Sequence, residues 1–340
     1  MKKIAFLLFC FQSLFTFSCS SQTANVGSAG IMFYNVENLY DTVDDPATDD
    51  AEFLPGSEHQ WTPERYQKKL EHIAQVIATG GNSMPVLVGM SEIENETVVK
   101  DLIAQPALQP GNFGIIHFDS PDERGIDVAL IYNKNIFTPE KYYPIHVTLP
   151  GDSIDYTRDI LYVSGNIIIN GKTQSLNIFV NHWPSRSEGE EVSMPKRAAA
   201  ASVLKHAVDS LNAAVKDANI IIMGDFNDTP YDKSINQVLG AVDSGDGALN
   251  DLMAQKQKNG EGSYNYKGNW QALDQFIVSA PLLDHKKMDV NVGSVEFVKR
   301  DWMLYHNEKY GDSPNRTYAG PKYIGGYSDH LPIYIELIIN

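Results

Sequence analysis

The residues whose types and spacing could do chemistry are concentrated in residues 220–228, which read Ile-Ile-Ile-Met-Gly-Asp-Phe-Asn-Asp. The apolar run predicts a buried strand that ends at Gly224, and Asp225 and Asn227 follow two positions apart. Residues two apart on an extended chain point the same way, so this carboxylate and carboxamide would face one cleft. Together they could hold Mg²⁺ or Mn²⁺ on a phosphate. An Asx-rich turn that only closes a strand would give the same pattern, so both interpretations stay open here.

Other apolar runs also end in polar residues that apolar alternation does not predict. These positions are Asn35, Glu92, Asn181, His182, Asp274, Asp329 and His330. If they converge, several carboxylates lie together and repel one another unless a cation neutralises them. A divalent metal is the simplest solution, although a histidine paired with an aspartate could instead be oriented for proton transfer.

Each of these residues also has an ordinary structural interpretation when taken alone. Glu92 could begin a helix, where acidic residues are favoured. His182 could be a core histidine next to Trp183, and Asp274 could belong to a hairpin. The functional interpretation gains its strength from the fixed order of the whole set.

Six short motifs occur in that order between Asn35 and His330. They are Tyr-Asn-Val-Glu-Asn, Ser-Glu-Ile-Glu, Asn-His-Trp, Gly-Asp-Phe-Asn-Asp, Leu-Asp-Gln-Phe-Ile-Val-Ser and Ser-Asp-His-Leu-Pro. This pattern resembles the endonuclease/exonuclease/phosphatase family, which includes DNase I-like and exonuclease III-like nucleases, sphingomyelinases and inositol-phosphate phosphatases. The resemblance implies an α/β fold, a four-layer sandwich of two mixed β-sheets packed face to face with helices outside. It also implies metal-dependent cleavage of a phosphoester.

The resemblance further implies a metal site. Glu92 would be the principal metal carboxylate, and Asn35 and Asp329 would lie in the same site. The expected ion is Mg²⁺, with Mn²⁺ as the alternative and Ca²⁺ as a further candidate, because magnesium uses one or two protein carboxylates together with substrate phosphate.

It implies catalytic roles as well. Asp225 would orient or activate the attacking water, with Asn227 holding metal or phosphate oxygen beside it. His182 would hydrogen-bond the phosphate. His330, oriented by Asp329, would act as general base or as a phosphate-stabilising imidazolium, so the choice of base between Asp225 and His330 stays open. Asp274 would orient one of the histidines.

Three arginines are candidates for binding substrate. Arg124 could offer a charged fork to a phosphate oxygen, with Asp127 orienting it, or the two could form a surface ion pair. Arg186 closely follows His182. Arg316 lies in a long connection, residues 298–327, that is rich in tyrosine and in basic residues and could contact substrate or pack as a lid.

Several local signals predict the elements that must position these residues. Thr62 followed by Pro63 predicts a helix start, and residues 195–215 predict an alanine-rich helix. Asn170-Gly171 predicts the turn of a hairpin between strands 161–169 and 175–181. Further strands are expected at 31–36, 85–90, 115–118, 128–132, 272–279 and 331–338.

The N-terminus reads as a targeting segment. Lys2 and Lys3 precede a short apolar run, and small residues surround Cys19. We expect residues 1–19 to be a signal peptide of the lipoprotein type with Cys19 lipidated, residues 20–29 to be a flexible tether, and residues 30–340 to form a single domain. The product would be a monomer of the cell envelope that contacts the membrane only through its lipid anchor; simple secretion is the alternative.

Composition narrows the function. The 340 residues hold 27 Lys and Arg against 43 Asp and Glu, which gives a formal net charge of −16. This charge argues against a protein that binds polyanions such as nucleic acid non-specifically through its whole surface. The two cysteines, Cys10 and Cys19, both lie in the expected signal, so no disulfide or cysteine metal site is expected in the domain. The predicted function is a metal-dependent nuclease acting on nucleic acid. A phosphatase or phosphodiesterase of small or lipid-derived phosphoesters, and a non-catalytic binding module, are the alternatives.

Overall fold

The computed structural model describes residues 27–151, 156–243 and 247–340. The expected signal peptide, with Cys19, lies outside the described residues, as does most of the expected tether. The first strand begins at Ala29, inside the stretch assigned to the tether. Among the residues that are described, no helix is both long and apolar enough to cross a membrane.

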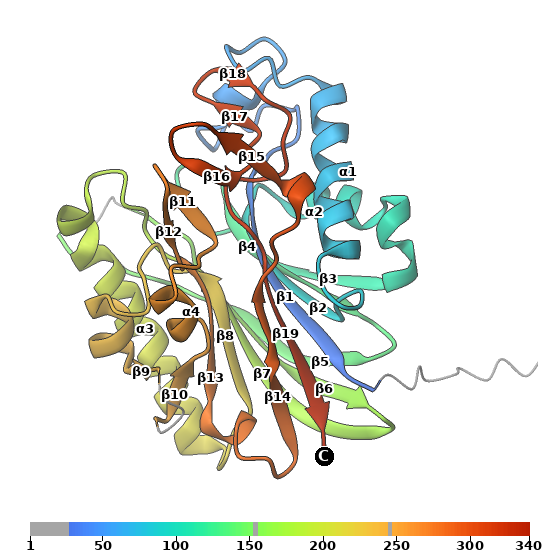
Figure 1. Ribbon diagram of the computed structural model, residues 1–340, viewed down its shortest axis with the longest axis vertical. Coiled ribbons are helices and arrows are strands. Elements are labelled where there is room, and N and C mark those ends of the chain that lie inside the picture. Colours follow the sequence, from blue (N-terminus) through green and yellow to red (C-terminus); the bar gives the residue numbers. More distant parts are fainter. Residues whose placement is uncertain (1–26, 152–155, 244–246) are drawn as a thin grey trace, which may run out of the picture.

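Two large sheets form the centre of the molecule (Figure 1). The first has the order β14 (Met288–Phe297), β19 (Ile333–Ile339), β1 (Ala29–Leu39), β2 (Leu87–Ile93), β4 (Asp127–Asn133) and β3 (Phe113–His117). The second has the order β5 (Phe137–Ile145), β6 (Ile160–Ile169), β7 (Lys172–His182), β8 (Ile220–Asp225), β13 (Asp274–Ser279), β10 (Leu249–Asp251) and β9 (Ala241–Val242). Both sheets are mixed, because β1 pairs with β2 and β7 with β8 in parallel.

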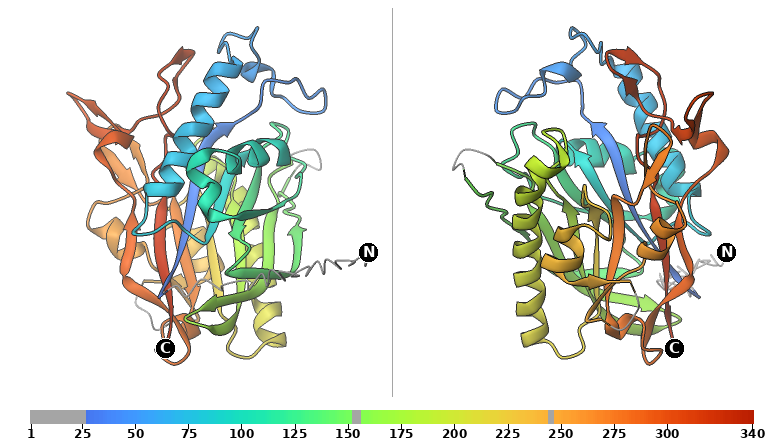
Figure 2. Two further views of the ribbon diagram at one scale, coloured as in Figure 1. Left: turned by 90° about the vertical axis from the view of Figure 1, so that its right-hand side faces the viewer. Right: turned by 60° about the vertical axis from the view of Figure 1, so that its left-hand side comes forward.

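The helices cover the two outer faces, which gives the predicted four-layer sandwich (Figure 2). The first sheet is covered by α1 (Pro63–Thr79), α2 (Glu96–Ile103) and the 3₁₀ turn η2 (Pro106–Gly111). The second is covered by α3 (Glu190–Ala214) and the π-helix η3 (Ser234–Leu239). The short helical segments are η1 (Ala51–Phe53), α4 (Ala254–Lys258), η4 (Ala280–Leu282) and η5 (Asp301–Met303).

Alternation along the strands produces this layering. In β1, Ile31 and Phe33 belong to the core between the sheets, whereas Met32 and Tyr34 belong to the cluster with α1. Successive side chains of a strand point to opposite faces, so a strand covered on both sides is apolar at nearly every position. This explains why the sequence shows continuous apolar runs rather than alternating ones.

Local signals placed most elements correctly. Thr62 caps α1 through its hydroxyl, which accepts from the Arg65 N–H at 3.4 Å, and Asn170 and Gly171 form the β6–β7 turn with φ of 52° and 71°. The third helix begins earlier than predicted, at Glu190, because Pro195 lies inside it and not at its first turn. The extra turn is held by the buried Arg197, which donates to the Ser193 hydroxyl at 2.7 Å and pairs with Asp228 at 2.7 Å.

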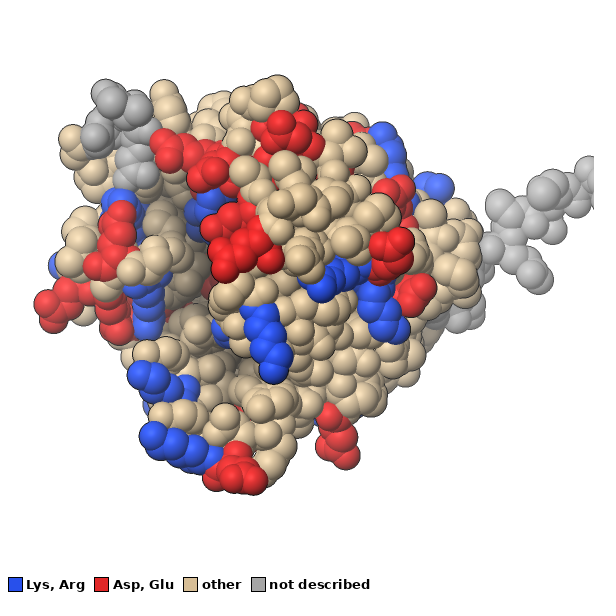
Figure 3. Space-filling model, turned by 90° about the horizontal axis from the view of Figure 1, so that it is seen from above, with Lys and Arg blue, Asp and Glu red and all other residues tan. Residues whose placement is uncertain are grey.

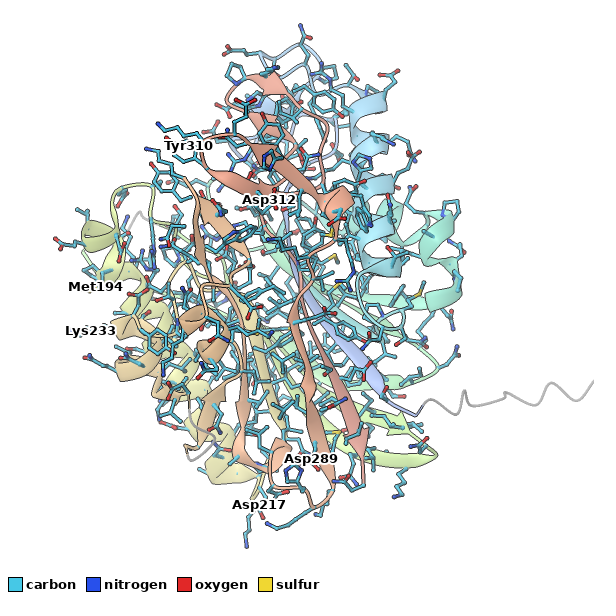
Figure 4. The ribbon with its side chains drawn as sticks, viewed as in Figure 1. Met194, Asp217, Lys233, Asp289, Tyr310 and Asp312 are labelled. Atoms are coloured by element: carbon cyan, nitrogen blue, oxygen red, sulfur yellow. The ribbon has the colours of Figure 1, made fainter. Side chains whose placement is uncertain are left out.

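The polar residues predicted at the strand ends lie together at one end of the sandwich. The parallel strands β1 and β2, and β7 and β8, end there, and the antiparallel β13 and β19 begin there. Three small hairpins stand above this end: β11 (Tyr264–Tyr266) with β12 (Asn269–Gln271), β15 (Leu304–Asn307) with β16 (Gly311–Pro314), and β17 (Tyr318–Ala319) with β18 (Lys322–Tyr323). Figure 4 shows Tyr310 and Asp312 at this upper end and Asp217 and Asp289 at the opposite one.

A buried carboxyl group in β10 makes stability depend on pH. Burial raises the pKa of Asp251 from its ordinary value of 3.8 to about 7. One carboxylate oxygen accepts the Met253 N–H at 2.9 Å, and the other has no hydrogen-bond partner among the described residues. The folded chain keeps the proton between these two pH values and the unfolded chain releases it, so the free energy of unfolding falls as pH rises from about 4 to about 7.

We therefore expect Asp251→Asn to be more stable than wild type at pH 8, by on the order of a few kcal/mol, and little different at pH 4. Thermal unfolding at both pH values measures this. Glu58→Gln, at an exposed position, is the matched control that should change neither value. Equal stabilisation by Asp251→Asn at both pH values would contradict the assignment.

Candidate active site

Three site residues come from one row across the second sheet. His182 of β7 is the register partner of Asp225 in β8, and Asp225 is the register partner of Asp274 in β13. Register partners on neighbouring strands point to the same face, so the sheet itself brings these side chains together. All three are buried. The convergence expected from the strand ends therefore has a definite cause in strand pairing.

Asp329 had been expected to orient His330, but the residue that orients it is Asp274. Its Nδ1 lies 2.6 Å from Asp274 Oδ2, and its Nε2 lies 3.8 Å from Asp225 Oδ2. Asp329 lines the same cavity but pairs with Arg316 at 3.4 Å. Asp274 reaches His330 from a distant part of the chain, through the pairing of β13 with β8, and the sequence alone does not show this pairing.

Burial and charge set the protonation states of the two histidines. Burial alone would lower the pKa of His330, but Asp274 and Asp225 raise that pKa well above its usual range, so this ring is an imidazolium at neutral pH. Burial and the guanidinium of Arg158 hold the pKa of His182 well below its usual range, so that ring is neutral. Burial also raises the pKa of Asp225 to about 7, although His330 opposes the shift. The site thus contains both a proton donor and a carboxyl group able to accept a proton near neutrality.

Asn35 connects the carboxylates of the two sheets. Its Nδ2 donates to Glu92 Oε1 at 3.2 Å and to Asp225 Oδ2 at 3.0 Å. Its Oδ1 accepts the Glu37 N–H at 2.9 Å. Asn35 therefore bridges carboxylates of the two sheets, and because an amide oxygen has a second lone pair, its expected role as a metal ligand stays a prediction.

Glu92 has the properties expected of a metal carboxylate. It lies in β2 where the pairing with β1 and β4 shifts register, and its φ of 61° is in the left-handed region. Such backbone strain in a non-glycine residue is typical of functional positions. Burial would raise the pKa of Glu92, but Arg124 and the Asn35 amide hold it below its usual range, so the side chain is ionised.

The donor set fits a hard divalent cation. Glu92, Asp225 and Asp329 all line one cavity of about 550 Å³, together with His182 and His330. Figure 3 shows the hollow at this end of the molecule. Carboxylate oxygens with room for water suit Mg²⁺. The nearby group of Asp225, Asp274 and His330 fits a metal less well, since the imidazolium and its partner already neutralise each other.

Asn227, two residues after Asp225, lies beyond the end of β8 and does not continue the strand. Asn227 has a φ of 50°, so it does not lie parallel to Asp225 as an extended chain would require. Its N–H donates to Asp225 Oδ1 at 2.9 Å and its amide donates to the Trp183 carbonyl at 3.0 Å. Asn227 lines the cavity while fixing the orientation of Asp225.

The three arginines have different surroundings. Arg124 lines the cavity beside Glu92 and donates to the Asn38 side chain. The expected partner Asp127 is elsewhere, bound to His117 at 3.0 Å and to Ser120.

Arg186 also borders the cavity, but it is held by Asp228 at 3.0 Å and Asp232 at 2.9 Å and so braces the loop after β8. Arg316 reaches the site through its ion pair with Asp329.

Sequence reasoning missed two supporting groups. Arg158 is buried against Asp122 at 2.9 Å and donates to the Trp183 carbonyl at 2.7 Å, and it lowers the pKa of His182. Lys69 is buried in α1, where its ammonium donates to the Thr317 hydroxyl at 2.6 Å and lies 3.6 Å from Glu37. A lysine next to Leu70 on the apolar face of a predicted helix was the one available signal for it.

Comparison with known proteins adds an independent observation. Residues 30–338 match the model of the endonuclease/exonuclease/phosphatase family. The chain belongs to this family. Its members hydrolyse phosphoesters with a divalent metal, so the chain is a phosphoric ester hydrolase, as predicted. No curated protein matches it.

Solved structures share the fold at low identity. Truncated Caenorhabditis elegans TDP2 is 18% identical with a TM-score of 0.53, over 92% of this chain and 97% of that one. A family protein from Bacteroides thetaiotaomicron is 17% identical with a TM-score of 0.52, over 92% and 95%. D. rerio TDP2 complexed with a single-strand DNA product is 14% identical with a TM-score of 0.54, over 91% and 98%. At these identities the likeness establishes the DNase I-like sandwich.

The His330–Asp274 pair can be tested by one substitution. Asp274→Asn removes the carboxylate that contributes most to raising the pKa of His330, so that pKa should fall and turnover should drop about 10²-fold or more. NMR titration of the His330 imidazole and the pH profile of hydrolysis measure the two effects. The control is Asp312→Asn, which alters the surface pair His306–Asp312 at 2.9 Å. An unchanged His330 titration in Asp274→Asn would refute the pairing.

Proposed function

We propose that this family member is an exported nuclease that cleaves phosphodiesters with Mg²⁺ by in-line attack of water. The observation that carries the proposal is the bridge of Asn35 between Glu92 and Asp225, with the His330–Asp274 pair beside it. Through Asn35, the candidate metal carboxylate Glu92 and the candidate proton acceptor Asp225 lie close together in one cavity.

The roles of the residues follow from their surroundings. Asp225 orients the attacking water and takes its proton, since burial keeps the pKa of this carboxyl near neutrality. The His330 imidazolium and the neutral His182 donate hydrogen bonds to the non-bridging oxygens as negative charge develops on them. Glu92, with Asp329 nearby, would hold the divalent ion. That ion, when bound, supplies charge neutralisation at the phosphate.

Two observations support nucleic acid as substrate. D. rerio TDP2, which shares this fold, is complexed with a single-strand DNA product. In this chain, Tyr264 packs beside the His330 ring at a centroid distance of 5.1 Å, and Tyr266 is exposed at the rim of the same cavity. Aromatic side chains at such a rim can stack on bases.

A small phosphoester is the second candidate, and the charge favours it. A formal net charge of −16 disfavours long polyanions. The salt dependence of substrate binding distinguishes the two candidate substrates. Binding that weakens steeply as salt is added indicates several phosphate contacts, and a nearly flat response indicates a small ester.

We expect residues 20–340 to hydrolyse phosphodiesters with Mg²⁺ or Mn²⁺ and to lose turnover in EDTA. The panel is plasmid, linear and single-stranded DNA, RNA, bis-p-nitrophenyl phosphate, inositol phosphates and sphingomyelin. Nicking of plasmid establishes an endonuclease, whereas hydrolysis of only the small or lipid esters replaces the nuclease proposal with the phosphatase branch. Absence of hydrolysis across the panel, with metal bound, contradicts both and favours the binding module.

The metal carboxylate has its own test. Glu92→Gln keeps the shape of the side chain but removes the charge, so Mn²⁺ binding should weaken at least about tenfold, measured by calorimetry, and turnover should fall with it. Glu96→Gln, which breaks only the surface pair with Lys100 at 2.7 Å, is the control. Unchanged Mn²⁺ affinity in Glu92→Gln would place the metal elsewhere.

Export through lipidation of Cys19 is also part of the proposal. The basic start, the short apolar run and the small residues around Cys19 support it. Cys19→Ser should move the protein from the membrane to the soluble fraction and abolish labelling by a radioactive fatty acid. Equal labelling of the two forms would exclude this anchor.

A further inference from the structure

A second cavity opens from the catalytic centre, and we call it the side cavity. Its volume is about 440 Å³, within the range of small-molecule sites. It lies between the loop that carries Asp49, Glu52 and Phe53 and the segment Arg316–Gly320. Glu92, Arg124 and Asp329 line both this cavity and the catalytic one, so the two cavities meet at the candidate metal carboxylate.

The side cavity has an aromatic wall. Tyr40 and Phe53 stack with centroids 4.3 Å apart, Phe53 is 5.4 Å from His59, and His59 is 4.6 Å from Tyr318. All four residues line the cavity, where Phe53 and His59 are partly exposed and Tyr40 and Tyr318 are buried behind them. A row of ring faces and edges suits a planar aromatic group, because every such group offers a π-face for stacking.

The charges of the side cavity disfavour a further phosphate. Its two cations lie near the catalytic centre, Arg124 beside Glu92 and Arg316 in its pair with Asp329. The acidic residues Asp49 and Glu52 are exposed and line the cavity. Among the described residues that line it, no lysine is present. A polyanion that continued into this cavity would meet these carboxylates.

The direction of attack assigns the cavity a role. Asp225, to which the proposed function assigns the attacking water, and His330 line the catalytic cavity and not the side cavity. In an in-line displacement, the nucleophile and the leaving group lie on opposite sides of phosphorus. A phosphoryl group held near Glu92 and Arg124, and attacked from the side of Asp225, expels its leaving oxygen toward the side cavity.

We propose that the side cavity binds the leaving group, and that this group is a single uncharged aromatic alcohol of about nucleoside size. This rests on the proposed function. The water oxygen forms a bond to phosphorus while Asp225 takes its proton. The bond from phosphorus to the leaving oxygen breaks, its electron pair stays on that oxygen, and solvent water protonates it. The enzyme then releases one nucleoside from the end of a strand or from a small diester.

Phe53→Ala tests the aromatic wall. We expect its KM for diadenosine monophosphate, two nucleosides joined by one phosphodiester, to rise about fivefold or more with a smaller change in kcat. Adenosine binding, measured by calorimetry in EDTA, should weaken by a similar factor. Tyr305→Ala, an exposed tyrosine that does not line the side cavity, is the matched control with both values unchanged.

Asp49→Asn combined with Glu52→Gln tests the charge without touching the core, since both residues are exposed. In wild type, a terminal phosphate on the leaving nucleoside of that dinucleotide should lower kcat/KM about fivefold or more, and the double variant should recover most of this loss. Loss in the variant equal to that in wild type would overturn the charge argument.

These experiments distinguish a failure of the leaving-group assignment from a failure of the proposed function. If wild type hydrolyses no phosphodiester with any metal, the proposed function fails, while adenosine binding in EDTA still tests the side cavity. If wild type nicks closed plasmid, whose leaving group is a polyanionic strand, the leaving-group assignment is wrong although the proposed function holds. The assignment is also wrong if wild type hydrolyses phosphodiesters but adenosine binds equally to wild type and Phe53→Ala, or to neither.

Discussion

The accumulation of buried and half-buried carboxylates where the two sheets meet is the constraint on which the rest of this structure depends. Glu92 belongs to one sheet and Asp225 and Asp274 to the other. Such charges repel strongly when water is removed. The protein offsets this in two ways: the Asn35 amide donates to two of the carboxylates, and the His330 imidazolium sits against the third. A divalent cation bound near Glu92 would neutralise the negative charge that remains there.

The backbone around these carboxylates is held in unusual conformations. Glu37 and Asn38 each have a φ of 52°, in the left-handed region. These conformations let the Glu37 N–H reach Asn35 and the Asn38 N–H reach Glu92 at 2.8 Å. The buried Lys69 anchors Glu37 and also donates to the Tyr327 carbonyl at 2.8 Å. Helix α1, the end of β1 and the segment before His330 are thereby fixed as one unit, and local strain is supported by contacts outside the site.

The two cavities give the same centre two different environments. The catalytic cavity holds His182, Asp225 and His330, to which the proposed mechanism assigns the handling of protons and of developing charge. The side cavity holds aromatic rings and an acidic rim. A phosphoester lying across Glu92 would therefore have its two substituents in chemically distinct surroundings. In the proposed mechanism, this division would give selectivity for the leaving group without any change in the groups that carry out the hydrolysis.

The sequence by itself determined the family and most of the residues around the site, because six short motifs stand in a fixed order, and the two-sheet architecture was implied by that resemblance. Apolar runs and turn residues by themselves predicted most of the strands and helices. Only the tertiary structure decided which residues pair. Asp274 and not Asp329 orients His330, because strand register places Asp274 beside Asp225. Asn35 bridges two carboxylates because the fold brings Glu92 of β2 and Asp225 of β8 to its amide nitrogen. The partners in these contacts come from separate strands or depend on left-handed backbone, and a linear pattern contains neither kind of information.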